Sequence, residues 1–222
     1  MSGAALSGRL SNPPSSILSK SIKILAIDTS TDACSVALSI QGYIEEQFVL
    51  APRTHTHLVL PMIDALLKKA DLTLSEIEVF AFGRGPGSFT GVRITSSIIQ
   101  ALGFGLNKPI IPVSTLRALA QAAYQEQGAR RVLAYLDARM QEIYWGLFEI
   151  DVEGIMQPVL EERVQSPKEI NYPVGDFLQV TGYPHAKEIA RIAAADYSLG
   201  HVVSAKDAVP VYLRDKVVWL QK

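Results

Sequence analysis

Two aspartates in this chain each end an apolar run at the point where a polar turn begins. Asp28 follows one such run and Asp137 follows another. Carboxylates at the ends of two strands can hold a metal-bound nucleotide between them, which is the arrangement of an ATPase or a kinase. The alternative is structural: Asp28 caps its own turn through the hydroxyl residues that follow it, and Asp137 pairs with Arg139 or Arg131. The residues alone leave both interpretations open.

A glycine-rich segment at residues 83–93, with the sequence GRGPGSFTGVR, is the second candidate. It follows an apolar run at 77–82 that predicts a buried strand and precedes a run at 94–106 that predicts a helix. Such glycines indicate positive φ angles or a second backbone very close by. The N–H groups at the start of the helix could hold an anion, or the glycines could serve close packing only. Neither standard phosphate loop fits, because no Gly-Lys-Ser/Thr is present and position 111 is Ile111 rather than an acid.

The remaining groups that could do chemistry are one cysteine and four histidines. Cys34 lies in an apolar strand, where we expect a buried and inert thiol. A single cysteine also excludes a disulfide within the chain and a cysteine-based metal cluster. His55 and His57 face opposite ways on an extended segment, and His185 and His201 stand alone. We expect the histidines to be solvated or to cap turns, and we expect neither a metal nor a cofactor.

The bulk composition indicates a globular protein with an ample core. The chain has 222 residues, 48% of them hydrophobic, and a formal net charge of −1 without any run of Lys or Arg. It therefore lacks the basic surface needed to hold nucleic acid unaided, and any role on RNA requires a partner. No apolar run approaches the ~18 residues of a spanning helix. Residues 1–21 are rich in Ser, Gly and Pro and predict a disordered extension of a cytoplasmic protein.

The elements that position these residues follow a repeated order. The first half predicts three antiparallel strands, a helix, a strand that leads into the glycine-rich segment, and a second helix, at 22–27, 33–40, 43–50, 56–70, 77–82 and 91–107. The second half starts the pattern again and is abbreviated, with strands and helices at 109–113, 115–127, 131–136, 142–150, 155–164, 177–181 and 185–195. An apolar tail at 210–219 is expected to dock on the body.

Each half thus contains a strand that ends in an acid, followed by a strand that runs back beside it, so the same arrangement occurs twice. This arrangement is that of the actin, Hsp70 and sugar-kinase group. The predicted fold is α/β, with two tandem actin-like or RNase H-like (ASKHA) subdomains facing a cleft, the second abbreviated. We place the N-terminal subdomain at residues 22–107 and the C-terminal subdomain at residues 108–222.

Five segments of the chain resemble the TsaB (YeaZ) family of bacteria. The segments are residues 24–31, 83–93, 111–116, 137–140 with Tyr144 and Trp145, and 210–214. That family is the partner subunit of the complex that attaches threonylcarbamoyl to adenosine 37 of tRNAs reading ANN codons. The resemblance implies a non-catalytic scaffold that dimerises with the catalytic paralogue TsaD and works with the ATPase TsaE. It also implies self-pairing when the subunit is alone, and contact with tRNA only indirectly.

The same resemblance implies a pseudoenzyme. Where the paralogue reads Val-His-His-Met-Glu-Gly-His, with two histidines that bind its metal, this chain reads VSTLRAL and has Thr115 and Leu119 at the ligand positions. These side chains cannot replace two imidazoles on one metal. A metalloprotease is excluded because no His-Glu-x-x-His is present. The alternative function is an actin-like ATPase or kinase using Asp28 and Asp137, although the second half has no cluster of glycines for an adenosine loop.

The helix at 91–107 predicts the partner surface. Its apolar residues go most of the way round, so more than one side should be buried, and its own sheet can cover only one. The alternative is a helix sandwiched inside its own subdomain. Together with the resemblance, this predicts partner contacts at Leu58, Pro61, Met62, Ala65, Arg93, Ile94, Ser97, Ile98 and Ala101. Residues that could still face a nucleotide are Asp28, Thr29, Ser30 and Asp137.

Overall fold

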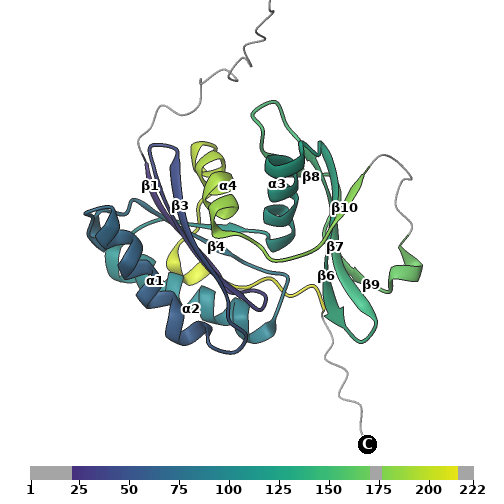
Figure 1. Cartoon of the computed structure of the whole chain (residues 1–222), viewed down its shortest axis with the longest axis horizontal. Helices are drawn as coiled ribbons and strands as arrows, with labels where there is room; N and C mark the ends of the chain where they lie inside the picture. Colours follow the sequence, from purple (N-terminus) through teal and green to yellow (C-terminus); the bar gives the residue numbers. More distant parts are fainter. Residues whose placement is uncertain (1–21, 171–176, 215–222) are drawn as a thin grey trace, which may run out of the picture.

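The computed structural model describes residues 22–170 and 177–214, which contain two sheets with helices between and outside them (Figure 1). The predicted extension at 1–21 and the end of the apolar tail, at 215–219, lie outside the described residues. The first sheet has the order β3-β2-β1-β4-β5, and its strands are β1 (Lys23–Asp28), β2 (Ala33–Ile40), β3 (Tyr43–Leu50), β4 (Val79–Gly83) and β5 (Ile110–Val113). The three antiparallel strands predicted at its start are confirmed.

The second sheet has the order β10-β6-β7-β8, and β9 also pairs with β7. Its strands are β6 (Arg131–Arg139), β7 (Glu142–Ile150), β8 (Met156–Pro158), β9 (Arg163–Gln165) and β10 (Leu178–Val180). The strand predicted at 155–164 is wrong as one element, because β8 and β9 pair with opposite ends of β7. The chain leaves the sheet after Pro158, and Glu162 in the loop between them turns inward to the hydroxyl of Ser114.

The helices are α1 (His55–Lys69), α2 (Phe89–Leu106), α3 (Thr115–Gln127) and α4 (Ala186–Ser198), with short 3-10 turns η1 (Leu74–Glu76), η2 (Pro167–Glu169) and η3 (Ala205–Asp207). Local signals explain the bounds of α3, since the Ser114 hydroxyl accepts from two N–H groups of its first turn and Gly128 ends it with a positive φ. Pro61 is the seventh residue of α1 and is exposed. The backbone hydrogen bond that this proline cannot make is therefore on the solvent side of the helix.

Among the described residues, no helix is both long and apolar enough to cross a membrane.

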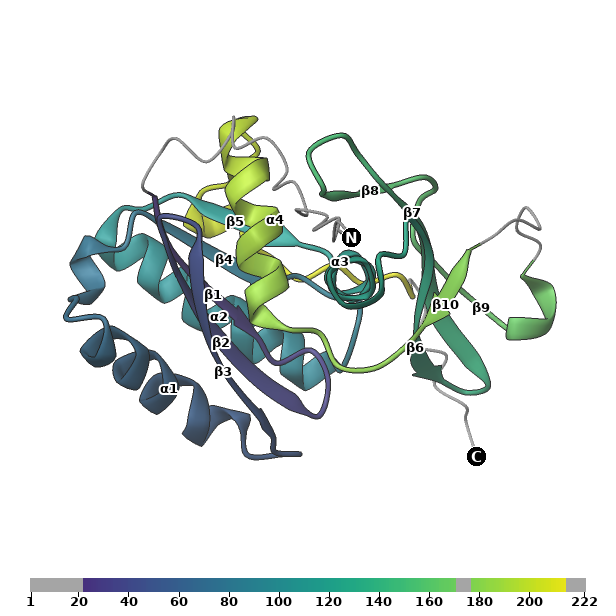
Figure 2. The same ribbon diagram turned by 45° about the horizontal axis from the view of Figure 1, so that its top comes forward.

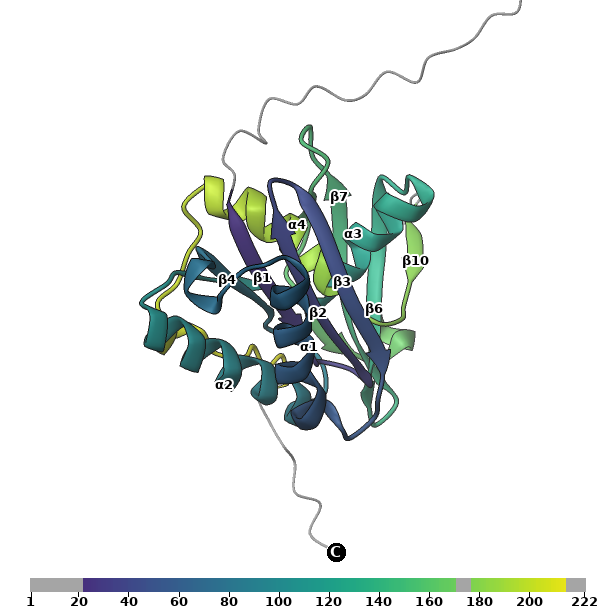
Figure 3. The same cartoon turned by 60° about the vertical axis from the view of Figure 1, so that its left-hand side comes forward.

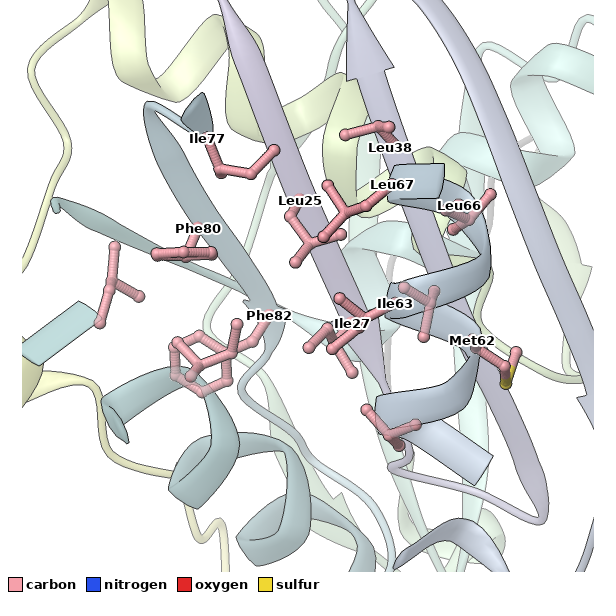
Figure 4. Close-up of a cluster of buried hydrophobic side chains, with 14 of the residues drawn as sticks. Leu25, Ile27, Leu38, Met62, Ile63, Leu66, Leu67, Ile77, Phe80 and Phe82 are labelled. Atoms are coloured by element: carbon pink, nitrogen blue, oxygen red, sulfur yellow. The ribbon is translucent and has the colours of Figure 1, made fainter. Parts of the chain in front are cut away.

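The first sheet is covered on both faces, which is why its central strands are continuous apolar runs. Leu25 and Ile27 of β1 face α1 and α2 and form one core cluster, drawn in Figure 4. Ile24 and Ala26 point the other way and pack against α4, which crosses the opposite face (Figure 2). This second layer is rich in alanine on both the strands and the helix, so α4 can lie close to the sheet.

Elements that follow residue 107, where the subdomain boundary is predicted, also cover and extend the first sheet. β5 pairs with β4 in that sheet, and α4 packs on it although it follows the second sheet in sequence. Helix α3 packs on β6, β7 and β8 instead. A largely buried ion pair joins α3 to α4, because Arg117 donates to both carboxylate oxygens of Asp196 at 2.7 and 3.1 Å.

The glycine-rich segment between β4 and α2 lies against the turn that joins β1 and β2. A Cβ atom on Gly87 would be 2.3 Å from the carbonyl oxygen of Ser30, and one on Gly91 would be 1.9 Å from that of Thr29. The N–H of Ser88 donates to the same Ser30 oxygen at 2.6 Å. The glycines therefore allow one backbone to touch another, which confirms the packing interpretation of this segment and fixes where α2 begins.

Gly91→Ala should lower the free energy of unfolding by at least ~2 kcal/mol, because the added methyl group collides with a backbone oxygen that cannot rotate away. Gly105→Ala in the same helix is the matched control, since nothing lies within 4 Å of its Cβ position. There the change should be neutral or stabilising by up to ~1 kcal/mol. Urea unfolding of both variants measures this, and equal midpoints for the two would contradict the packing described here.

Candidate functional site

Asp28 is completely buried at the end of β1. Its Oδ1 accepts hydrogen bonds from the backbone N–H and the hydroxyl of Ser30, both at 2.9 Å. Within the described chain, no group donates to its Oδ2, which points at the backbone of Gly83. Burial raises the pKa of Asp28 to about 7, against the lowering effects of the Ser30 hydrogen bonds and of the charge on His185. At pH 7 the neutral and the charged forms of this carboxyl group are therefore about equally stable.

Asp137 has the opposite environment. It lies at the turn between β6 and β7, its side chain is exposed, and it accepts the backbone N–H of Arg139 at 2.8 Å and pairs with the Arg139 guanidinium at 3.2 Å. The structural interpretation of both aspartates is therefore confirmed, since each serves its own turn. Of the four residues predicted to be able to face a nucleotide, Asp28, Thr29 and Ser30 have no exposed surface in this structure, and Asp137 is exposed.

The positions that correspond to the paralogue's metal ligands are filled by core contacts. Thr115 is fully buried, and its hydroxyl donates to Ser30 Oγ at 3.3 Å. Leu119 packs in the core cluster between α3 and the second sheet. Among residues 22–170 and 177–214, no group of three His, Cys, Asp or Glu side chains is placed to hold a metal ion. The structure offers no donor set at this place.

The cysteine and two of the four histidines behave as expected, but the extended segment expected at His55 and His57 is wrong, because both lie in the first turn of α1. His57 and His201 are exposed, and His185 precedes α4, where Nδ1 lies 2.9 Å from Glu46 Oε2. His55 is the exception, because its side chain is buried at the start of α1 and its Nε2 has no partner among the described residues. Burial raises the pKa of Cys34 to about 11, which confirms an inert thiol.

A hollow of about 680 Å³ lies beside the carboxyl ends of β4 and β5, facing the second sheet. Its polar side chains are those of Arg84, Ser114, Arg117, Glu161 and Glu162. Burial raises the pKa of Glu162, against the hydrogen bond from Ser114 and the charges of Arg84 and Arg117. The Ser114 oxygen also accepts two N–H groups of α3. These groups hold the loop before β9 against α3, and the serine acts as a helix cap rather than as a nucleophile.

The most exposed apolar surface near the predicted site is the outer side of α1 and α2, which lie next to each other outside the first sheet (Figure 3). A groove of about 520 Å³ separates them and is lined by Thr56, Leu60, Phe89, Thr90, Arg93, Ile94, Ser97 and Ile98. Leu60 and Phe89 are each 56% exposed, and Phe104 near the end of α2 is 84% exposed. Leu60 and Phe89 line the same groove, and exposed apolar side chains gathered in this way mark a site of association.

The predicted partner residues divide into two groups in the structure. Arg93, Ser97 and Ala101 are exposed on α2, Ile94 and Ile98 are half-buried in the groove, and Pro61 and Ala65 are exposed on α1. Two predicted contacts lie on the wrong side of α1. Met62 is buried in the core 3.6 Å from Cys34 Sγ, so it cannot touch a partner, and Leu58 packs at the edge of that core.

Sequence reasoning missed Leu60, Phe89 and Phe104. The signal for Leu60 was available, because the buried positions of α1 follow the spacing Val59, Met62, Ile63 and Leu66, and Leu60 falls outside that stripe. An apolar residue out of phase with the core stripe of its helix points to solvent or to another molecule. The exposure of Phe89 depends on how the first turn of α2 meets the glycine-rich segment, which periodicity does not report.

Comparisons with known proteins agree on the family. The family model described as "TsaD: tRNA N6-adenosine threonylcarbamoyltransferase" matches residues 49–218. The tRNA threonylcarbamoyladenosine biosynthesis protein TsaB of Escherichia coli is 40% identical over 89% of this chain and 97% of its own length. TsaB of Haemophilus influenzae is 39% identical over 90% of this chain and 97% of its own length. The solved structure of YeaZ from Pseudomonas aeruginosa has a TM-score of 0.83 and 40% identity, covering 86% of this chain and 100% of that one.

The chain therefore belongs to the TsaB (YeaZ) family, within the wider group that the TsaD family model describes. The predicted ASKHA-like α/β fold is confirmed by the same neighbours and by the two sheets.

Asp28→Asn should flatten the dependence of stability on pH. The folded pKa of about 7 lies above the unfolded value of 3.8, so the folded chain keeps a proton that the unfolded chain releases. The wild-type free energy of unfolding therefore loses a contribution as the pH rises between these values. The variant carries no such proton, and its stability relative to wild type should rise from pH ~4 to pH ~8.

Urea unfolding at several pH values measures that difference, and subtraction of the wild-type curve removes the effects of the other buried acids. Asp137→Asn is the control, because this exposed side chain should leave the curve parallel to wild type. Parallel curves for Asp28→Asn as well would show that Asp28 is charged and compensated in the folded chain.

Proposed function

We propose that this member of the TsaB family takes part in tRNA threonylcarbamoyladenosine biosynthesis as a non-catalytic subunit. In this proposal it dimerises with TsaD, and the dimer works with the ATPase TsaE to transfer threonylcarbamoyl to adenosine 37 of tRNAs that read ANN codons. The names of the two relatives from Escherichia coli and Haemophilus influenzae, both biosynthesis proteins of this modification, support the process. The observation that carries the scaffold role is the exposed apolar groove between α1 and α2.

That groove is the part of α2 which the chain's own fold leaves uncovered. The inner side of the helix is used, because Val92 and Ile99 are buried against the sheet. The outer side presents Phe89, Arg93, Ser97 and Ala101, each one helical turn from the next. The small side chains in the middle let another helix approach closely, and the aromatic group at one end adds contact area. We infer that TsaD covers this side, and that a second copy of the chain covers it when TsaD is absent.

The buried state of Asp28 supports a subunit without its own nucleotide chemistry. An ATPase of the actin-like group would need both acids at a common cleft, and here one has no exposed surface while the other lies exposed beside Arg139. The net charge of −1 supports indirect contact with tRNA, because a protein that holds a phosphate backbone unaided carries a basic surface. In this proposal TsaE supplies ATP hydrolysis, and TsaD supplies the catalytic site.

Ser97→Arg should weaken binding to TsaD by at least ~100-fold, because it places an unpaired charge among apolar groups at a cost of several kcal/mol. The melting temperature should change little, since Ser97 is exposed in the free chain. Calorimetry with purified TsaD measures the affinity.

Gln125→Arg is the matched control, because it adds the same charge at an exposed position of α3. It should bind as wild type does. Normal binding by Ser97→Arg, or loss of its fold, would remove this side of α2 from the interface.

Asp28→Asn should keep threonylcarbamoyl transfer by the reconstituted complex within about tenfold of wild type. An acid that takes part in the chemistry usually costs ~10²-fold or more when it is neutralised. The assay needs a parallel measurement of complex assembly by size-exclusion chromatography. A hundredfold loss of transfer in a complex that is still assembled would show that Asp28 takes part in the reaction.

A further inference from the structure

The C-terminal segment at residues 208–214 adds side chains to the rim of the α1–α2 groove. The ring of Tyr212 lies 5.8 Å from the ring of Phe89, and its hydroxyl is 2.9 Å from Nε of Arg93. The guanidinium of Arg93 lies over the Phe89 ring, with 3.7 Å between its central carbon and the ring centre. Both aromatic rings are about half exposed, at 56% for Phe89 and 45% for Tyr212.

Anchors on both sides hold Tyr212 in place. Before it, the hydroxyl of Ser96 on α2 donates to the carbonyl oxygen of Ala208 at 2.7 Å, and the N–H of Val211 donates to that of Arg84 at 2.8 Å. After it, Arg214 donates to the carbonyl oxygen of Ala138 at 3.1 Å and pairs with Glu142. The segment runs from beside α2 to the second sheet, as its yellow trace in Figure 1 shows. The phenol is therefore presented on a fixed backbone.

The charge on Arg93 has no carboxylate partner among the described residues. The ion pairs of the structure do not include it, α2 contains no acid, and the other side chains that line the groove are uncharged. Nε of Arg93 donates a hydrogen bond to the Tyr212 hydroxyl, and contact with the Phe89 ring restrains the guanidinium. A partner that covers the groove removes water from this cation, which is costly unless the partner brings a carboxylate to it.

We infer that the C-terminal segment is part of the docking surface and that Tyr212 positions Arg93 to receive a carboxylate of the partner. This inference rests on the proposed function, and the occupant is the same TsaD-type subunit, which presents apolar side chains to the groove and an acid at its rim. Arginine and aromatic side chains in such clusters supply most of the binding energy in many interfaces. Cation–π contact with two rings adds to the hold on Arg93.

A double-mutant cycle on TsaD binding tests this positioning role. Tyr212→Phe keeps the ring and removes the hydroxyl, and it should weaken binding about 5- to 10-fold, because a less restrained Arg93 side chain must then be immobilised when the partner binds. Arg93→Ala should weaken binding more, and it should also reduce the dependence of affinity on salt. In the Arg93→Ala background, Tyr212→Phe should change affinity by less than about twofold, because the group that it positions is gone.

Tyr183→Ala is the control for Tyr212→Ala. The two tyrosines are almost equally exposed and each packs against a phenylalanine ring, but Tyr183 lies beside Phe48 on β3. Tyr212→Ala should weaken binding at least ~10-fold, whereas Tyr183→Ala should bind as wild type does. Melting temperatures of all variants show whether the fold is kept.

The outcomes separate this inference from the proposed function. If Ser97→Arg prevents binding but the Tyr212 variants bind as wild type does, the inference on the C-terminal segment is wrong and the TsaD proposal stands. If Tyr212→Phe weakens binding equally with and without Arg93, Tyr212 acts independently and the positioning role is overturned. If the wild-type chain does not bind TsaD, both are overturned.

Discussion

The close contact between two backbones at the end of β1 determines the position of everything that follows. Gly87 and Gly91 lie against the carbonyl oxygens of Ser30 and Thr29, at distances that leave no room for a Cβ atom. The hydroxyl of Thr29 adds hydrogen bonds to Gly91 and Thr95 on α2. Helix α2 therefore starts at a fixed point and in a fixed rotation, with Val92 inside and Arg93 outside. The outward side of α2 is a consequence of that rotation.

A second close contact, at Gly83, accompanies the burial of Asp28. A Cβ atom at Gly83 would collide with Asp28 Oδ2 on one side and come within 3.4 Å of Ile189 of α4 on another. Residues of β4 and α4, distant in sequence from Asp28, thus pack around the end of β1. The carboxylate keeps its turn in place through hydrogen bonds from Ser30, and burial raises its pKa.

Helix α4 packs on the first sheet, and polar groups from β2 and β3 hold its start. The hydroxyl of Ser35 accepts the N–H of Ala186 at 2.9 Å, and Glu46 accepts the N–H of Lys187 at 3.1 Å and lies beside His185. Burial would raise the pKa of Glu46, but hydrogen bonds from His185, Lys187 and Ser35 hold it below its ordinary value. A negative charge at a helix N-terminus is favourable. The second half of the chain is thereby fastened to the first.

The sequence by itself determined the elements and the family. Local signals were sufficient for these predictions, because each depends only on neighbouring residues. The signals were the apolar runs before Asp28 and Asp137, the helix cap at Ser114, the helix end at Gly128 and the glycine-rich segment. It was harder to predict which side of each helix packs against the sheet. Periodicity shows that α1 has an apolar stripe, but Leu60 and Met62 are equally apolar, and only packing against the sheet turned Met62 inward and left Leu60 at the groove. Helix α2, apolar nearly all round, could not reveal which side its own chain would cover.

Contacts between residues far apart in the sequence decided the rest. The burial of Asp28 depends on α4, more than 150 residues away, and the place of Tyr212 beside Arg93 joins residues 119 positions apart. No local pattern encodes such a contact. The residues around each partner are compatible with many surfaces of suitable chemistry, and only the fold determines which one is in contact. Tertiary structure alone therefore decided that Asp28 is buried and that Tyr212 lies at the rim of the groove.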